Sequence, residues 1–252
     1  MQLKRPAPGF TLTEMAVVVA IITLLIGGAM ATLSGITEQR NYDEATRRLN
    51  AAVDALIGYA VVNKRLPCPA VGGATGVESP LGGATACTSP YGGFLPAQTI
   101  GFTPVDSSGY GVDPWGNRIR YAVAATITGT GCTTTPHFTN QTNLKAQGVG
   151  CKPNDLDVFC STVAAGISST CNSGIRVTDQ NTIVFLVFST GKNGAISGEQ
   201  GADEAANTDG NANFINRFRS SSDSTLGIYD DVMVMVPVGV FYQKLISAGV
   251  LP

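Results

Sequence analysis

The chain begins with a long run of apolar positions. From Phe10 to Ile36 nearly every residue is apolar or small, and Glu14 is the only charged one. As a helix, the stretch Met15–Leu33 alone would extend about 28 Å, which is enough to cross the hydrocarbon part of a bilayer. We therefore predict a transmembrane helix over residues 10–36.

The pattern after Ile36 predicts that the helix continues with a different character. Apolar residues recur there at three- and four-residue steps and form one stripe: Tyr42, Ala45, Leu49, Val53, Leu56 and Ala60. Charged residues lie off this stripe, as expected for an amphipathic helix that packs on a domain. Proline cannot continue a helix, so Pro67 marks its end. We predict one helix from about Phe10 to Lys64, whose amphipathic half covers residues 37–66.

The remaining residues, 67–252, have the pattern of a globular domain with few strands. Residues 67–112 are rich in Gly, Pro, Ser and Ala and are predicted to form a long loop. The sequence Asp113-Pro114-Trp115-Gly116 fits a type I turn, and we expect Trp115 to lie in the core. Three strands are predicted, at Arg118–Thr128, Thr182–Ser189 and Asp231–Val238. Pro237 places the last strand at a sheet edge or terminus. The predicted fold class is α+β, with the long N-terminal helix on a small antiparallel sheet.

Charge adds a direction to the predicted anchor. Lys4 and Arg5 precede the apolar stretch, so the positive-inside rule places that end in the cytoplasm and the domain on the other side of the membrane. An ordinary secretory signal would carry its cleavage site after a shorter apolar run, whereas here Gly9 precedes a long one. The balance of 16 basic against 18 acidic residues gives no reason to expect a nucleic-acid partner.

The cysteines indicate disulfides. All six follow the apolar stretch, at Cys68, Cys87, Cys132, Cys151, Cys160 and Cys171, and no pair has the CxxC spacing of a zinc knuckle. On the oxidising side of a membrane, three disulfides that staple the long loops are the expected state. Six cysteines allow fifteen pairings, so the sequence leaves the connectivity open. Our first choice is Cys68–Cys87, Cys132–Cys151 and Cys160–Cys171.

The residues around Gly9 resemble a known signature. A carboxylate such as Glu14 is costly to bury within a membrane helix. Its presence suggests either a position at the membrane interface or a cation supplied by a partner. The sequence Gly9-Phe10-Thr11-Leu12-Thr13-Glu14, followed by a long apolar helix, resembles the prepilin signature of type IV pilins and type II secretion pseudopilins. The resemblance implies a leader over residues 1–9, a cut after Gly9 by prepilin peptidase and methylation of the new N-terminal Phe10. It also implies that Glu14 neutralises the amino terminus of a neighbouring subunit during assembly.

The same resemblance implies a structural subunit rather than an enzyme. Its partners would be prepilin peptidase, inner-membrane lipid and other pilin or pseudopilin subunits, first in the membrane and then in the filament. Many pilins and the major pseudopilin have a helix-kinking Pro where this chain has Ala31, and Gly27-Gly28 offers a weaker bend. This departure favours a minor pilin or pseudopilin over the bulk subunit. The alternative is a single-pass, membrane-anchored binding or adhesion module that does not polymerise.

Candidate chemistry is sparse in the rest of the chain. The polar stretch from Ser189 to Asp231 is rich in carboxylates, among them Asp203, Glu204, Asp209, Asp223, Asp230 and Asp231. Oxygen-rich loops of this kind hold calcium, but Asp and Asn also favour bare turns. If calcium binds, Asp230 and Asp231 are the preferred ligands, and the major pseudopilin binds calcium at a similar place. His137, the single histidine, lies in a Thr-rich segment and is expected to be exposed and inert.

Overall fold

The computed structural model describes residues 9–251, apart from 74, 84–85, 127–130, 163–170, 172, 179–180 and 197, and only the backbone of residues 28–34. Residues 1–8 of the predicted leader, with Lys4 and Arg5, lie outside the described residues. The chain forms two compact units, Met1–Asn41 and Tyr42–Pro252. Each unit is considered by itself below.

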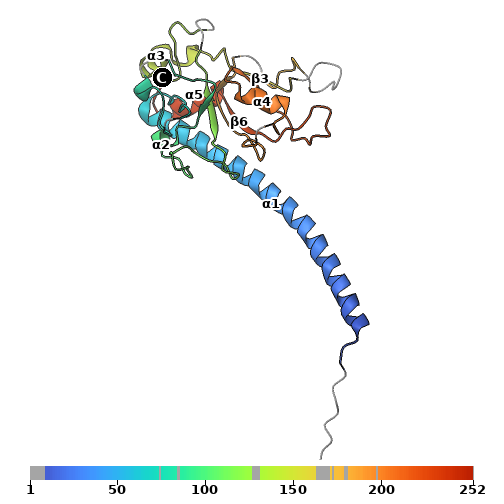
Figure 1. Ribbon diagram of the computed structural model, residues 1–252. Coiled ribbons are helices and arrows are strands. Elements are labelled where there is room, and N and C mark those ends of the chain that lie inside the picture. Colours follow the sequence, from blue (N-terminus) through green and yellow to red (C-terminus); the bar gives the residue numbers. More distant parts are fainter. Residues whose placement is uncertain are drawn as a thin grey trace, which may run out of the picture. The chain divides into compact units, whose positions relative to one another are not determined.

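A single helix, α1, runs from Leu12 to Asn63 and contains 52 residues (Figure 1). The prediction of one long N-terminal helix is therefore confirmed. Lys64, which follows the helix, has a φ of 56° and takes the backbone out of helical geometry. Within the part of the chain that the structure describes, no helix is both long and apolar enough to cross a membrane.

The amphipathic half of α1 packs through the predicted stripe. Ala45, Leu49, Leu56 and Ala60 are fully buried, and Val53 is half-buried against the same core. Apolar side chains at this spacing share one helix face, so they all meet the domain together. The pattern identified both the helix and the face that it buries.

The core of the domain is a four-stranded antiparallel sheet in the order β1-β2-β4-β6. Its strands are β1 (Gly93–Phe94), β2 (Arg120–Val123), β4 (Ile183–Ser189) and β6 (Val232–Pro237). The last three correspond to the predicted strands. β2 is shorter than predicted, and Thr126 beyond it has a φ of 55°, outside extended geometry. The predicted end of that strand, Thr128, lies outside the described residues. Pro237 ends β6 at a sheet edge, as predicted.

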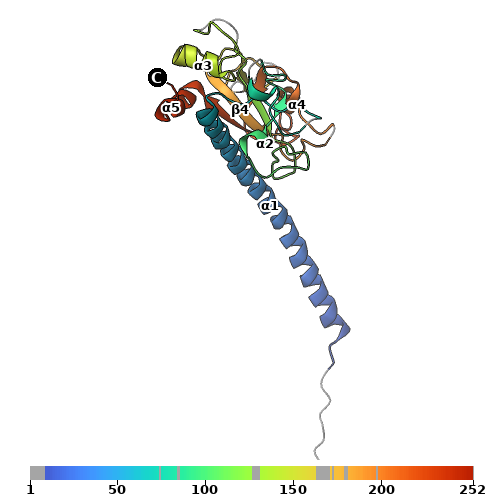
Figure 2. The ribbon, with the colours of Figure 1, turned by 90° about the vertical axis from the view of Figure 1, so that its left-hand side faces the viewer.

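Other elements cover the two faces of this sheet (Figures 1 and 2). On one face lie the C-terminal part of α1 and the helix α5 (Val238–Ser247), where Phe241 meets Phe185 of β4. On the other face lies a parallel pair, β3 (Asp157–Phe159) and β5 (Asn213–Ile215), where Phe214 meets Phe188 of β4. The helix α4 (Ala202–Thr208) packs beside β5. The shorter helices are α2 (Ala97–Ile100), α3 (Gln141–Gln147) and two 3-10 turns, Leu81–Gly83 and Gly148–Gly150. The fold is α+β, with a long N-terminal helix on an antiparallel sheet.

Three disulfides join parts of the loops. They are Cys68–Cys87, Cys132–Cys151 and Cys160–Cys171, with sequence separations of 19, 19 and 11. This is the pairing given as our first choice. Each bridge closes a loop between elements and so restricts the unfolded chain more than the folded one.

Two expectations about single residues are wrong. Trp115 is half-buried and meets the edge of Tyr42, while the core position in the turn belongs to Asp113, which is 2% exposed. The carboxylate of Asp113 accepts hydrogen bonds from the Trp115 N–H and from the Ser189 hydroxyl, which offset part of the cost of burying it. His137 is fully buried rather than exposed, because α5 brings Tyr242 over it at 2.9 Å from Nε2.

Candidate functional site

The predicted processing site lies just before α1. Gly9 and Phe10 are outside the helix, and the Phe10 side chain is 83% exposed. Glu14 lies in the first turn of α1, and its Oε2 accepts hydrogen bonds from the backbone N–H of Thr11 at 2.9 Å and from the Thr11 hydroxyl at 2.8 Å. The carboxylate therefore closes the first turn of the helix and stays accessible to a further partner.

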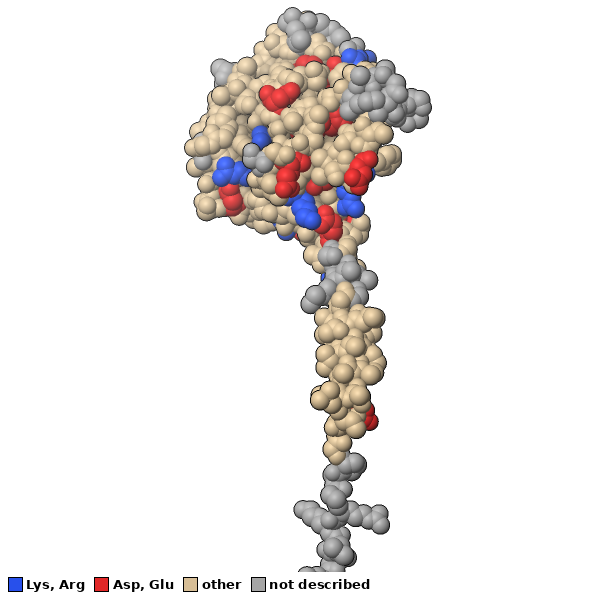
Figure 3. Space-filling model, turned by 45° about the vertical axis from the view of Figure 1, so that its right-hand side comes forward, with Lys and Arg blue, Asp and Glu red and all other residues tan. Residues whose placement is uncertain are grey.

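The surface around Glu14 is unusually apolar. The described residues of this half of α1 expose a continuous set of large hydrophobic side chains: Leu12, Met15, Val17, Val18, Val19, Ile21, Ile22, Leu24, Leu25 and Ile26. A soluble monomer rarely exposes a contiguous apolar patch of this extent, so the surface must be covered by lipid or by other protein. In Figure 3 the coloured charges gather on the domain, with acidic and basic groups interspersed, and the described part of the first unit is almost entirely tan.

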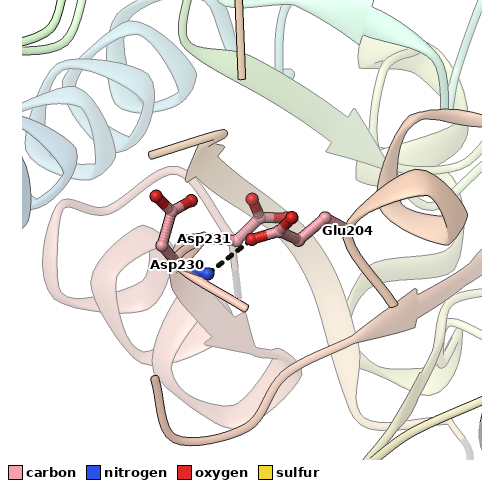
Figure 4. A group of neighbouring side chains, drawn as sticks. All are labelled: Glu204, Asp230 and Asp231. Carbon is pink, nitrogen blue, oxygen red and sulfur yellow. Dashed lines mark hydrogen bonds between the residues drawn. The ribbon is translucent and has the colours of Figure 1, made fainter. Parts of the chain in front are cut away.

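A second arrangement of functional side chains lies inside the domain. Asp230 and Asp231 come directly before β6, and Glu204 comes from α4 (Figure 4). All three are buried, and one oxygen of each carboxylate lies within 4.8 Å of those of the other two. An ion about 2.4 Å from each of its ligands can bridge oxygens up to about 4.8 Å apart, so this spacing suits a calcium ion.

Backbone and amide groups hold these carboxylates in place. Glu204 Oε1 accepts from the Asp230 N–H at 2.5 Å, while its Oε2 accepts from Asn193 Nδ2 at 3.0 Å. Asp230 Oδ2 accepts from the Lys192 N–H at 3.0 Å, and Asp231 Oδ2 accepts from Asn207 Nδ2 at 2.7 Å. Glu204 is thus held through both of its oxygens, and each aspartate is held through its Oδ2. Rigid ligands of this kind suit a metal site.

The other oxygens of this cluster lack donors. Among the described residues, no hydrogen-bond donor reaches the buried atoms Asp230 Oδ1, Asp231 Oδ1 and Asn193 Oδ1. An unpaired buried oxygen is destabilising, and a cation held among the three carboxylates would give the two aspartates the positive partner that they lack. Burial, together with the charge of Glu204, raises the pKa of both aspartates above its ordinary range. The donor set therefore fits an oxygen-seeking cation such as Ca²⁺.

The sequence anticipated this cluster in part. Asp230 and Asp231 were the preferred ligands, and the structure brings Glu204 to them rather than the neighbouring Asp203. Asp203 instead forms a buried ion pair with Arg217 at 2.7 Å. Asp209 and Asp223 are exposed, as expected for bare turns. The amides of Asn193 and Asn207 gave no signal in the sequence, because Asn is common in any polar loop.

His137 lies in a structural network. Its Nε2 pairs with the Tyr242 hydroxyl, which donates to the Cys151 carbonyl at 2.5 Å. Burial lowers the pKa of His137 to about 4, so the ring is neutral at pH 7. These contacts tie α5 to the loop that carries Cys151.

Comparison with known proteins identifies the N-terminal segment. Residues 4–30 match the family model described as the prokaryotic N-terminal methylation motif, which is the signature of type IV pilins and pseudopilins. This motif implies processing by prepilin peptidase and a pilin-like, membrane-anchored precursor with a structural role. Comparison with curated proteins and with solved structures gave no significant match.

Proposed function

We propose that this chain is a minor pilin or pseudopilin, a structural subunit of a type IV pilus or of a type II secretion pseudopilus. One observation carries the proposal: the methylation motif at residues 4–30 includes the exposed apolar stretch of α1, where Glu14 is the only charge. A helix with this surface needs a hydrophobic cover, which the membrane supplies before assembly and neighbouring helices supply afterwards.

The proposed pathway follows from the cost of charge in lipid. The precursor is anchored in the bacterial inner membrane with its N-terminus in the cytoplasm and its domain in the periplasm. Prepilin peptidase cuts after Gly9 and methylates Phe10, which creates a terminal ammonium. Glu14 of one subunit then pairs with the ammonium of its neighbour, and pairing offsets the desolvation of both groups. The filament core is built from these helices, and the disulfide-linked domain faces outward.

The first half of the helix fits the role of a minor subunit better than the role of the bulk subunit. Ala31 stands at the position of the helix-kinking Pro, and Gly27-Gly28 lowers helix stability only moderately. The helix that must leave the membrane is therefore less prone to bend there. A subunit present in few copies needs this transfer less often.

Sequencing the N-terminus of the chain purified from its host membrane tests the proposal. We expect a sequence that starts at Phe10 with an N-methyl group. An intact Met1, or a start beyond Ile36, would contradict the proposal. The second of these results would favour a secreted product instead.

Replacing the assembly carboxylate tests polymerisation separately. We expect Glu14→Val to be processed normally but to disappear from sheared filaments, because the neighbour's ammonium then lacks its counter-charge. Glu38→Val, which changes another carboxylate of α1, is the matched control and should be incorporated as wild type. Normal incorporation of Glu14→Val would refute the pairing role. If neither wild type nor control is found in filaments, the chain is a non-polymerising module.

A second proposal concerns the buried carboxylates. The unpaired oxygens of Asp230 and Asp231, together with the close approach of Glu204, favour a structural Ca²⁺ held by these three residues. The ion would join α4 to the segment before β6, and it would neutralise the repulsion between the three carboxylates. Melting of the purified chain with calcium and with a chelator tests this, and we expect a lower melting temperature with the chelator. Identical melting curves would argue against the ion.

A further inference from the structure

A polar cavity lies beside the sheet and shares no lining residue with either site described above. It has a volume of about 400 Å³ and is lined by Phe94, Asn117, Arg118, Arg120, Thr190, Gly194, Gln200 and Thr208. These residues come from β1, from β2 and the turn before it, from the loop after β4 and from the two ends of α4. A cavity of this size suits a small ligand. The two arginines, together with the amides and hydroxyls around them, indicate which kind of ligand the cavity would bind.

Arg120 is the less neutralised of the two arginines. Its guanidinium lies 4.3 Å from the centre of the Phe94 ring, and its Nη1 donates to the Gly92 carbonyl at 3.3 Å. No carboxylate of the described residues lies within ion-pair distance of it; Asp231 attracts it from farther away. A guanidinium has five N–H donors, so most of those on Arg120 are available to a ligand. The ring fixes the plane in which they lie.

Arg118 supplies a second positive charge on the same side of the strand. Residues two apart in a strand point to the same face, so Arg118 and Arg120 share one. Arg118 Nε donates to Asp106 at 2.7 Å, and its guanidinium lies over the ring of Tyr110 at 4.0 Å. These contacts hold Arg118 in place but use only part of its donors. Two like charges side by side favour an anion between them.

The remaining lining groups are suited to hydroxyls. Asn117 Nδ2 donates to the Gly191 carbonyl and Gln200 Nε2 to the Gly194 carbonyl. Both amides are oriented by these bonds, and within the described part of the chain neither side-chain oxygen has a donor. Thr190 and Thr208 add hydroxyl groups at the wall. Oriented amide oxygens beside hydroxyls are the groups that recognise a polyhydroxylated molecule.

We propose that this cavity binds a sugar acid, whose carboxylate pairs with Arg120 and whose hydroxyls contact Asn117 and Gln200. A planar carboxylate matches the fork of a guanidinium and forms two parallel hydrogen bonds with it. Phosphate is disfavoured, because it has too few hydrogens to donate to the oriented side-chain oxygens of Asn117 and Gln200. The ligand class is therefore a monocarboxylate such as a uronic acid.

Titration of the full chain in detergent with galacturonate tests the proposal, with galactose and inorganic phosphate as comparison ligands. We expect galacturonate to bind at least about tenfold more tightly than galactose, since a charge-assisted hydrogen-bonded pair contributes about 1.5–3 kcal/mol. Phosphate is expected to bind no better than galactose. Equal binding of galactose, tighter binding of phosphate or no binding of galacturonate would each overturn the proposal.

Variants locate the binding. Arg120→Gln is expected to weaken galacturonate binding by at least about tenfold, while Arg47→Gln on the exposed face of α1 leaves it unchanged. Unaltered circular dichroism shows that each variant is folded. If Arg120→Gln does not fold, Gln200→Ala at the cavity wall replaces it and should weaken galacturonate binding by several-fold. Unchanged affinity in the folded cavity variant would refute the site.

Discussion

The two halves of α1 use the same secondary structure in opposite ways. In the first half, Leu12 is 87% exposed and Leu24 is 78% exposed; in the second half, Leu49 and Leu56 are fully buried. The first half is apolar on all sides, whereas the second has one apolar stripe opposite charged groups such as Glu44 and Arg47. The apolar surface of the first half therefore needs a cover from outside the chain, whereas the apolar stripe of the second half is buried against the chain's own domain.

This difference separates assembly from stability. Side chains of the second half contribute to the free energy of unfolding of the domain, because unfolding returns them to water. Side chains of the first half are exposed in the folded chain, so unfolding of the domain changes their surroundings little. Mutations in the two halves should therefore act on different measurements.

The largest expected effect comes from removing apolar atoms in each half. Leu56→Ala should lower the free energy of unfolding of the domain by about 2–5 kcal/mol, because it leaves a cavity in a closed core. Ile21→Ala in the exposed half should change it by less than about 0.5 kcal/mol. Urea unfolding of the detergent-solubilised chain, followed by near-UV circular dichroism, measures both. Equal losses would break the distinction between the halves.

The proposed calcium ion should give the next largest effect, and only in the domain. At a free concentration one hundred times its Kd, an ion that binds the folded state stabilises it by about 2.7 kcal/mol. Asp231→Asn should abolish this gain, whereas Asp223→Asn at an exposed position should keep it. Melting each variant with calcium and with chelator measures the difference. A calcium shift that survives Asp231→Asn would place the ion elsewhere.

Stability of the domain should also depend on pH through His137. Its folded-state pKa of about 4 lies below the ordinary 6.5, so the unfolded chain takes up a proton in this range that the folded chain does not. The stability that the domain gains from a neutral His137 is complete above pH 6.5. It is lost as the pH falls toward 4, by about 1.4 kcal/mol per pH unit at most. Asp230 and Asp231, whose pKa values are raised, change stability in the opposite sense over an overlapping range.

Comparing two proteins isolates the histidine from these aspartates. His137→Gln should be less stable at neutral pH, because the contact with Tyr242 is altered, but its stability should fall less steeply between pH 6.5 and 4. The difference between the two pH profiles, measured by urea unfolding, reports His137 alone. Parallel profiles would show that the histidine is not neutralised by burial.

The smallest effect is expected on the exposed face of the second half. Glu44 pairs with Arg47 at 2.6 Å and with Arg48 at 2.8 Å, but the Arg47 side chain is 76% exposed. Solvent screens such pairs, so Glu44→Gln should cost the domain only about 0.3–0.5 kcal/mol. A loss of several kcal/mol in urea unfolding would show that this face is buried against something else.

Features that are local in the chain could be predicted from the sequence alone. The prepilin motif, the helix from Leu12 to Asn63 and its buried stripe depend on neighbouring residues and on a period of 3.6, so they were visible without a structure. The strands β4 and β6 were also identified, because each is a short run of strongly apolar residues. β1 has two residues and carries no pattern, so it was missed.

Contacts between residues distant in sequence could be identified only in the folded chain. Glu204 lies far from Asp230 in sequence, and several carboxylates with similar neighbours could have taken the same role. The burial of His137 depended on α5, which the sequence did not reveal. The cavity beside Arg118 and Arg120 is completed by α4 and the loop after β4. Packing sets these contacts by the shape and charge of whole surfaces, and a local pattern records neither.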